Sequence, residues 1–576
     1  MTVAFVRQLG AEPGVQLNPL QDSSEIPSSS NADQIFGIVM RATRGRIDKP
    51  FVVDSSNVYT KLGYGEPMRV SALNEAWVHV VEALSNGAYQ AVVQRLSTSE
   101  SKIKWAVVKK SEAALLSDVG SAEVGKAKVG GASSPTVLAE SPTFEFSTTT
   151  DDTAPEECFI AVKHLECFND GIKIRLHADQ NRVSGSNADT SEVTLQIVDP
   201  HNDEAIYEFK GSLLADARDD YGNSYYLPDV VASQTDAVEV LVGVTGAQAV
   251  IKPTEDGYGY DDNGSVAWAE SDTLVCFTEG TTEYETEDYV SACDKLQYTQ
   301  YDFAYLSSGG TQAKPLLQQL ALLAYATNKQ LRFDVPGTLS VDAAIAWVED
   351  LNFGASKGAH LLHAFWSPLK SDDPTGVNPK SVIGTATLNI AFACGRNAVK
   401  NAQGFAAKNY PIAGREWQIN RTGIVQICTP KKSEPDALAK AKINPVVYET
   451  YTGGGRYVFL DSLTCAPVEQ SQRKLIAVAD MSTDIDDQVT RYGKDCLQLP
   501  MDIAVKRMND KLESTFSGAQ ASGWLVPSND PAMGGAAYRY QAAPNALRPY
   551  DTMDVRYWLR YDGTNRQIYV TQTLTR

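Results

Sequence analysis

A pair of histidines and two groups of carboxylates are the residues whose spacing in this sequence could do chemistry. His360 and His363 form the only close pair among six histidines. We expect both in a strand over residues 359–366, where positions three apart face opposite sides of a sheet, so the two rings would not share a metal ion. The sequence therefore predicts no histidine metal site and little capacity for general acid–base catalysis.

The two carboxylate groups are better explained by structure than by catalysis. Residues 256–264 form an acidic, glycine-containing loop, but they lack the ligand spacing and the closing glutamate of an EF-hand, which favours a solvated turn. Asp484, Asp486 and Asp487 are expected where a helix begins, because the helix dipole stabilises carboxylates at that end. Both groups are therefore predicted to be structural.

The motifs of the commonest enzyme classes are missing from the sequence. It has no G-x-x-x-x-G-K-[ST] loop for a nucleotide, no G-x-S-x-G elbow and no H-E-x-x-H zinc motif. Gly453, Gly454 and Gly455 lack the lysine that would reach a phosphate, which favours a turn. We therefore do not expect an enzyme, and we expect no catalytic, cofactor-binding or metal-binding residues and no cofactor.

The eight cysteines are scattered along the chain without a C-x-x-C pair, so a structural zinc site or a redox motif has no support. Buried free thiols are the favoured interpretation for a protein made in the cytoplasm. Cys158 and Cys167 flank an expected strand pair, so a bridge between them stays open. Disulfides formed between subunits after release from a cell stay open as well.

Length and composition indicate a protein with several domains. The chain has 576 residues, of which 43% are hydrophobic, enough for roughly three or four domains. No signal segment is evident, and no apolar run approaches the roughly 20 residues that cross a bilayer. We therefore expect a soluble protein made in the cytoplasm, with no membrane partner.

Charge is distributed unevenly along the chain. The net charge of −20 argues against a nucleic-acid backbone as the main partner. Residues 111–300 contain 36 acidic and 10 basic residues, a net charge of −26, which leaves +6 for the rest of the chain. We expect the acidic segment to face solvent, while the mildly basic remainder is free to meet an acidic partner.

The first elements predict an arm followed by an α/β layer. Residues 1–33 have little core-forming pattern and indicate a flexible arm whose residues 2–6 are strand-like. An apolar-periodic helix over residues 72–84 with strands before and after it indicates the α/β layer. A stretch rich in Gly, Ala, Ser, Pro and Thr over 120–154 predicts a linker or a long surface loop, and short runs between 159 and 244 predict a mostly antiparallel β domain.

The remaining elements alternate again and end in strands. Helix and strand signals follow each other from residue 303 to residue 366. Later we expect a strand over 475–479, helical stretches around 486–498 and 501–516, and two final strands over 553–561 and 567–574 around an Asp-Gly turn. The expected domains are an arm at 1–33, a discontinuous middle α/β domain at 34–110 and 300–400, an acidic β-rich insertion at 111–299, and a C-terminal core domain at 401–576.

Three stretches carry a family resemblance. Residues 50–65 read PFVVDSSNVYTKLGYG, residues 207–209 and 219–227 read YEF and DDYGNSYYL, and residues 443–446 and 453–464 read INPV and GGGRYVFLDSLT. In these motifs and in element order the chain resembles the contractile tail sheath family of myophages, shared with bacteriocin-like and type VI secretion sheaths. Two pairs depart from the family pattern, since its arginine–threonine pair is Asp461-Ser462 here and its tryptophan–glycine pair is Phe459-Leu460.

The resemblance implies an α+β and α/β multidomain chain with a sheath-type C-terminal α/β domain, an inserted mostly antiparallel β domain and strand-donating termini. It implies a structural subunit of a contractile phage tail sheath that polymerises as a helical lattice around the inner tube and contracts to drive the tube through the host envelope. The expected partners are further copies of the chain, the tail tube protein, and baseplate and neck or terminator proteins, in the tail of a virion and without direct nucleic-acid contact.

Strand exchange is the implied mode of assembly, with the acidic insertion facing outward. Tube contact is expected on the helix over residues 501–516, although an ordinary solvated helix face explains the same residues. The expected exchange residues are Thr2, Val3, Ala4, Phe5, Val6, Ile568, Tyr569, Val570, Thr571 and Leu574, and the expected tube contacts are Lys506, Arg507 and Lys511.

Two other functions fit parts of the sequence. Another virion structural protein, a capsid or tube subunit, belongs to the same class, but a tube subunit should be smaller and mainly β. A glycan-binding or hydrolytic tail protein would use the β insertion, with Tyr258, Tyr260 and Trp268 as a sugar platform and paired carboxylates as glycosidase groups.

Overall fold

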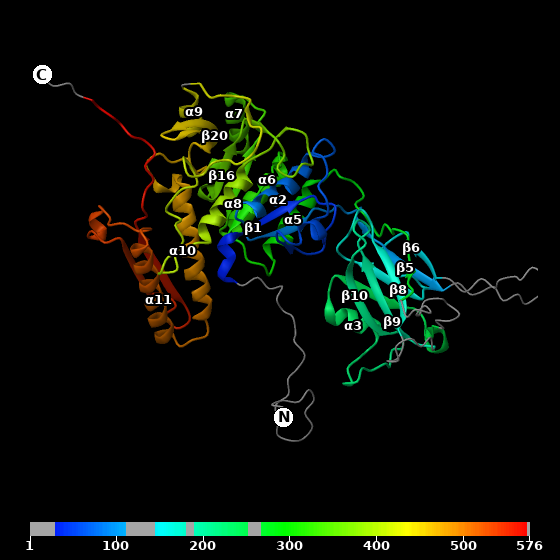
Figure 1. Ribbon diagram of the computed structural model, residues 1–576. Helices are drawn as coiled ribbons and strands as arrows, with labels where there is room; N and C mark the ends of the chain where they lie inside the picture. The colour runs from blue at the N-terminus through cyan, green and yellow to red at the C-terminus, as the bar shows by residue number, and fades with distance from the viewer. Residues whose placement is uncertain (1–28, 111–143, 180–188, 252–265, 432, 573–576) are drawn as a thin grey trace, which may run out of the picture. The chain divides into compact units, whose positions relative to one another are not determined.

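The computed structural model describes residues 29–110, 144–179, 189–251, 266–431 and 433–572 (Figure 1). Within these ranges the chain forms two compact units. The unit called the β unit here comprises Thr43–Gly45 and Thr98–Thr282. The other, the α/β unit, comprises the described parts of Ser23–Ala42, Arg46–Ser97 and Glu283–Arg576.

The α/β unit is built on an eight-stranded sheet with the order β2-β3-β1-β14-β15-β16-β20-β21. The six inner strands run parallel, and an antiparallel strand closes each edge. The strands are β1 (Ile35–Met40), β2 (Phe51–Val53), β3 (Gln90–Arg95), β14 (Tyr305–Ser307), β15 (Gln330–Val335), β16 (Leu362–Trp366), β20 (Ile443–Tyr451) and β21 (Gly454–Phe459).

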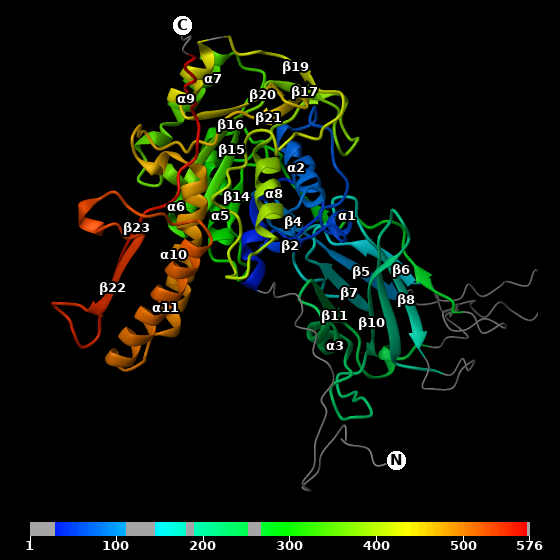
Figure 2. The same cartoon turned by 60° about the vertical axis from the view of Figure 1, so that its left-hand side comes forward.

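Both faces of this sheet are covered by helices, so strands such as β1 (IFGIVM) are buried on both sides along their whole length. In β1, Phe36 and Ile38 pack into the core beneath α2 and α8, while Ile35 and Val39 pack into the core beneath α5, α6 and α7. Figure 2 displays α2 and α8 on one side of the sheet. The helices are α1 (Val58–Leu62), α2 (Glu75–Ser85), α5 (Thr286–Gln297), α6 (Lys314–Thr327), α7 (Val341–Leu351), α8 (Ala386–Asn397) and α9 (Glu434–Lys440).

The end of the chain forms a helical pair with a hairpin. Helices α10 (Ile476–Asp495) and α11 (Met501–Ala521) pack together, and β22 (Tyr538–Pro544) and β23 (Met553–Leu559) form a two-stranded sheet. The strand expected over residues 475–479 is wrong, because these residues are the first turns of α10. Met481, Ile485 and Val489 continue their apolar stripe at helical spacing.

The β unit is a sandwich of two four-stranded antiparallel sheets with a shared core, β10-β9-β8-β12 and β11-β7-β5-β6. Arg44 is fully buried in it between Asp170 and Asp199, with its Nη1 2.5 Å from Asp199 Oδ2. The unit also contains the short helix α3 (Leu227–Gln234). The main strands are β5 (Trp105–Lys110), β6 (Phe144–Thr148), β7 (Ile160–His164), β8 (Lys173–Asp179), β9 (Glu192–Val198), β10 (Ala205–Ser212), β11 (Val238–Val242) and β12 (Ala269–Glu270).

The mixed α/β multidomain class and the antiparallel character of the β unit are confirmed. The linker expected over 120–154 is wrong at its end, because β6 pairs with β5 from Lys110–Phe144 to Ala106–Thr148. Helix α8 was not expected, because all but one of its twelve residues are buried and it presents no polar face for a 3.6-residue period to reveal.

Candidate functional site

The segment from residue 567 onward, called the tail here, is strand-like in sequence and, as far as the structure describes it, lies outside any sheet. Residues 567–572 form no strand within the described chain, and Ile568, Tyr569 and Val570 are 76%, 89% and 88% exposed. The strand expected over residues 567–574 is therefore not formed within the single chain as far as residue 572, and its donation to a neighbour stays a prediction. Leu574, Thr2, Val3, Ala4, Phe5 and Val6 lie outside the described residues, and Thr571 is exposed.

The outer edge of β23 in the hairpin β22–β23 is open. The main-chain N–H and C=O of Ala542 are both bound by the side chain of Asn509, each at 3.1 Å, so both groups point away from β23. Ala542 lies opposite Val555, and in an antiparallel pair of this type both residues turn their main-chain groups outward. Every second residue of β23 therefore offers an N–H and a C=O that bind no other group of the described chain: Met553, Val555, Tyr557 and Leu559.

The helical pair holds this hairpin in place. The ring of Phe516 on α11 contacts those of Tyr538, Tyr540 and Tyr557, at centroid distances of 5.7, 6.0 and 5.5 Å. The Tyr557 hydroxyl also donates to Asp486 on α10. The side chains of β23 that face the helices are apolar and half-buried, so the edge is fixed before any partner arrives.

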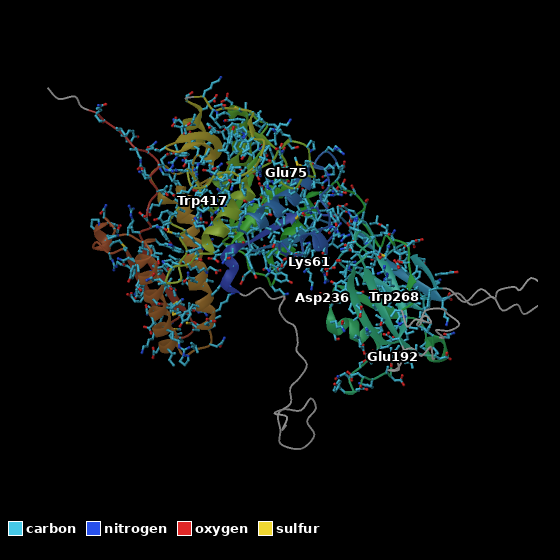
Figure 3. The ribbon with its side chains drawn as sticks, in the orientation of Figure 1. Lys61, Glu75, Glu192, Asp236, Trp268 and Trp417 are labelled. Atoms are coloured by element: carbon cyan, nitrogen blue, oxygen red, sulfur yellow. The ribbon has the colours of Figure 1, made fainter. Side chains whose placement is uncertain are left out.

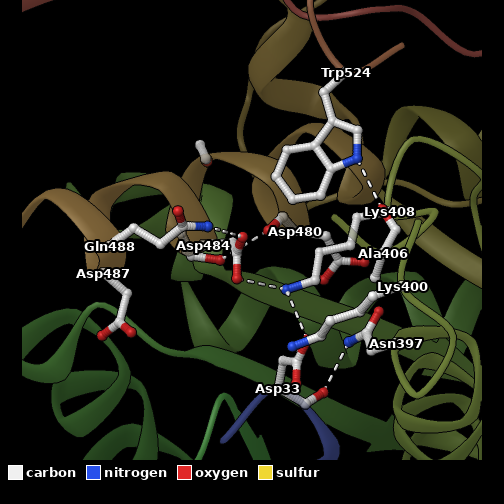
Figure 4. Close-up of polar contacts among 12 residues, drawn as sticks. Asp33, Asn397, Lys400, Ala406, Lys408, Asp480, Asp484, Asp487, Gln488 and Trp524 are labelled. Atoms are coloured by element: carbon white, nitrogen blue, oxygen red, sulfur yellow. Dashed lines mark hydrogen bonds and ion pairs between the residues drawn. The ribbon is translucent and has the colours of Figure 1, made fainter. Parts of the chain in front are cut away.

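A polar cavity of about 320 Å³ lies where the N-terminal arm joins the sheet (Figure 4). Asp33, in the short helix Ser29–Gln34, lies 3.4 Å from Lys400 and 4.0 Å from Lys408, and its main-chain oxygen accepts from Asn397 Nδ2 at 2.8 Å. Lys408 is also 2.9 Å from Asp484 on α10. The root of the arm is thereby tied to both the loop after α8 and the helical pair.

Charge in this cavity is matched rather than concentrated. Deep beside it, Asp480 lies 2.9 Å from Arg396 and 3.4 Å from Arg332. Burial acts to raise the pKa of Asp480, but the two guanidinium groups outweigh it and hold the pKa below its usual value. Burial acts to lower the pKa of Lys408, and its carboxylate neighbours outweigh that and raise it. Four acidic and four basic side chains line the cavity, so it offers a structural network and no unbalanced charge for an ion.

The three aspartates expected at a helix start lie in the middle of α10, so the capping interpretation is wrong. Because the helix starts at Ile476 rather than near Asp484, none of them is near its N-terminal end. Each instead binds a different element. Asp484 pairs with Lys408, Asp486 accepts from Tyr557 and Asn328, and Asp487 pairs with Arg491 and Lys329.

The histidine pair differs from expectation in one respect, since His360 belongs to a 3-10 turn and only His363 is in a strand. His360 Nδ1 lies 3.3 Å from Arg473, whereas His363 Nε2 lies 3.2 Å from the main-chain oxygen of His360. The two rings thus have separate partners. Within the described ranges no three His, Cys, Asp or Glu side chains are placed to hold a metal ion, and the acidic loop at 256–264 lies outside those ranges.

A second buried charge cluster, absent from the sequence analysis, joins α2 to the loop before α8. Glu75, labelled in Figure 3, lies 3.2 Å from His79 and accepts the main-chain N–H of Gly384 at 2.8 Å. Arg421 binds Glu82 through Nε and Nη2 of its guanidinium and donates to two main-chain oxygens of the same loop. A charged residue on the otherwise apolar helix α2 is the signal in the sequence that could have revealed this cluster. The contacts are internal, so the cluster fastens the fold.

The expected tube contacts share one helix but differ in exposure. Lys506 and Arg507 are exposed on α11, whereas Lys511 is half-buried with its ammonium 5.8 Å from the Tyr492 ring. For the sugar platform, Trp268 (Figure 3) is half-buried with its ring 5.5 Å from that of His177, while Tyr258 and Tyr260 lie outside the described residues.

Two general properties bear on the class of protein. All eight cysteines are free, and Cys167 is buried while Cys158 is half-buried, so no bridge joins them. Among the described helices, none combines the length and apolarity that crossing a bilayer requires.

The sequence matches no known protein family and no curated protein. Solved structures give partial likenesses to chains of contractile injection assemblies. A chain of the anti-feeding prophage (AFP) baseplate, 6-fold symmetrised, has 13% identity and a TM-score of 0.38, over 53% of this chain and 77% of that one. A chain of the PVC extracellular contractile injection system, in its contracted sheath complex, has 14% identity and a TM-score of 0.39, over 50% and 74%. A chain of the contracted AFP baseplate has 12% identity and a TM-score of 0.36, over 52% and 79%.

Proposed function

We propose that the chain is the sheath subunit of a contractile phage tail, which polymerises around an inner tube and contracts to drive that tube through the host envelope. The observation that supports this most is that one unit has both an exposed strand-like tail and an open strand edge. A tail of one copy that pairs with β23 of the next satisfies the outward main-chain groups of Val555 and Tyr557 and buries the tail's apolar side chains.

Apolar and polar side chains alternate along the tail, and this alternation determines which side of a donated strand would face the helices. An added strand continues the layer of β23, whose helix-facing side chains are apolar. Ile568 and Val570 would therefore turn toward α10 and α11, and Tyr569 and Thr571 would turn away. Ile568 and Val570 are the side chains that gain most from docking.

The donated tail and the accepting edge of β23 are different surfaces of the subunit, and this determines the symmetry of the assembly. A contact between unlike surfaces repeats from head to tail, so it closes into a ring or continues as a helix. A helical lattice of this sort can enclose a tube, and the main-chain pairing can persist while the bodies of the subunits rotate. Contraction is then the passage from a metastable lattice to a more stable one, and it needs no nucleotide.

Other parts of the chain receive roles under this proposal. The network around Asp33 would hold the root of the N-terminal arm, the second expected donor. The exposed Lys506 and Arg507 on α11 would face the tube, and the acidic β unit would face outward. Baseplate and neck or terminator proteins would cap the two ends of the lattice, in the tail of a virion made in the host cytoplasm.

Sedimentation of the purified protein over a range of concentrations, followed by negative-stain microscopy of the pellet, tests the proposal. Full-length protein should pellet as long hollow cylinders above a threshold concentration. A chain that lacks residues 567–576 should stay a folded monomer, and so should one in which a Gly-Ser stretch of equal length replaces them. Full-length protein that stays monomeric at all concentrations, or cylinders from the truncated chain, would rule the proposal out.

A further inference from the structure

We propose that the ion pair between Arg566 and Asp461 keeps the tail from folding back onto β23 of its own subunit, so that donor and acceptor both stay open for neighbours. The inference rests on the proposed function, because donation to a neighbour is the reason for keeping the tail open. The geometry of the ion pair itself belongs to the single subunit.

The local sequence favours the closed alternative. Two alternating strand-like segments, residues 553–561 and 567–574, flank Asp562 and Gly563, and such a pattern is typical of a β-hairpin. The edge of β23 that such a hairpin would use is open. Pairing within one chain also has the advantage of a high effective concentration, in the millimolar range for short linkers. Something must therefore act against the hairpin.

The segment between β23 and the tail is held on the body instead, and three of its contacts bear on the direction of the tail. The N–H of Asp562 donates to the main-chain oxygen of Trp524 at 2.9 Å. The side-chain amide of Gln472 donates to the main-chain oxygen of Tyr561 at 2.7 Å. Tyr561 continues the outward-facing series of β23, so Gln472 takes the first position at which a returning strand would start to pair.

The third contact ends the anchored segment. Arg566 binds Asp461, in the loop after β21, through Nε and Nη2 of its guanidinium, with Nε 2.8 Å from Oδ1. The two side chains are 24% and 15% exposed, whereas Ile568, two residues further on, is 76% exposed. A bidentate arginine–carboxylate pair fixes direction as well as distance. Among the residues that the structure describes, as far as 572, Arg566 is thus the last one held on the body, and the tail begins there.

Hydrogen–deuterium exchange of the peptide spanning β23, measured on dilute monomer, tests the anchor without requiring assembly. Asp461→Asn and Arg566→Gln should free the tail to close, so exchange at the outward amides should slow by roughly three- to tenfold, a size set by the strength of a partly exposed bidentate pair. The charge swap Asp461→Arg with Arg566→Asp should return exchange to the original rate. Asp436→Asn, which breaks the exposed Asp436–Lys440 pair on α9, is the matched control and should change nothing.

Removal of residues 567–576 in the Asp461→Asn background identifies the protecting segment. If the chain's own tail protects β23, this deletion should restore fast exchange, and the protection should not depend on protein concentration. Unchanged exchange in both single variants, or protection that survives the deletion, would overturn the anchor proposal. Failure of the full-length protein to form cylinders would contradict the proposed function alone, because the exchange result is obtained on monomers.

Discussion

The alternation of apolar and polar side chains along the tail predicts which substitutions should stop assembly. Changing Ile568 and Val570 together to alanine removes the side chains that would pack against the helical pair. Changing Tyr569 and Thr571 together to serine alters the opposite side of the same segment and serves as the matched control. Strand donation predicts a large effect for the first pair and a small one for the second.

The size of the effect on association follows from how exposed the two apolar side chains are in the free subunit. Ile568 and Val570 are 76% and 88% exposed, so nearly all of their burial would occur on docking. Full burial of such side chains contributes about 1.5–3 kcal/mol each, and alanine keeps part of that, so the double change should remove about 2–4 kcal/mol. Association should weaken roughly 30- to 800-fold. The control pair should weaken it by less than about tenfold, since only strand propensity changes.

The assay is the threshold concentration for sedimentable polymer, with urea unfolding of each monomer as the control for folding. Because the tail has few contacts with the body beyond Arg566, all variants should unfold at the same urea concentration as the original chain. Equal effects of the two pairs on the threshold, or no effect of Ile568→Ala with Val570→Ala, would refute the period-2 packing of a donated strand.

Three further predictions concern the body that presents the acceptor. Asn509→Ala should speed amide exchange in β22 without global unfolding, because it leaves Ala542 without its partner, at a local cost of about 1–3 kcal/mol. Arg421→Met should lower the free energy of unfolding by about 3–5 kcal/mol in urea, because it leaves Glu82 buried and uncompensated, whereas Lys440→Met should lower it by less than about 1 kcal/mol. Burial, helped by Arg332, lowers the pKa of His363 to about 3. An unfolded histidine titrates near about 6.5, so stability is full above that pH and falls below it by up to about 1.4 kcal/mol per pH unit. Between pH 7 and pH 5 the free energy of unfolding of the His363→Leu variant should therefore fall by about 2 kcal/mol less than that of the original chain.

Much of the fold was accessible from sequence, because its parallel strands and amphipathic helices have strong local patterns. Helix and strand signals alternate from residue 303 to residue 366, and within that range α7 begins after Ser340, whose side chain accepts the N–H of Ala343. One of the short β-type runs expected between residues 159 and 244 is β9, Glu192–Val198. Helix α8 escaped notice because burial on all sides removes the polar half of the pattern.

The candidate site was accessible only in part. The alternation in residues 567–574 is a local signal in the sequence, and it is the basis on which this segment is proposed as the donor. The acceptor edge depends on Asn509 and Ala542, which are 33 residues apart and meet only in the folded hairpin. Likewise, the apolar start of α10 suggested a strand, and this shifted the expected helix start toward Asp484 and produced the wrong capping interpretation. Contacts of this kind depend on tertiary packing, which no local period reports.

A reconstruction of the polymer by electron cryomicroscopy tests strand donation most directly. The account predicts a hollow cylinder in which residues 567–572 of one copy run beside β23 of an adjacent copy, with Ile568 and Val570 toward α10 and α11 and with Arg566 still on Asp461 of its own subunit. Cylinders in which each tail pairs with its own β23, or in which the β23 edge stays open, would contradict it.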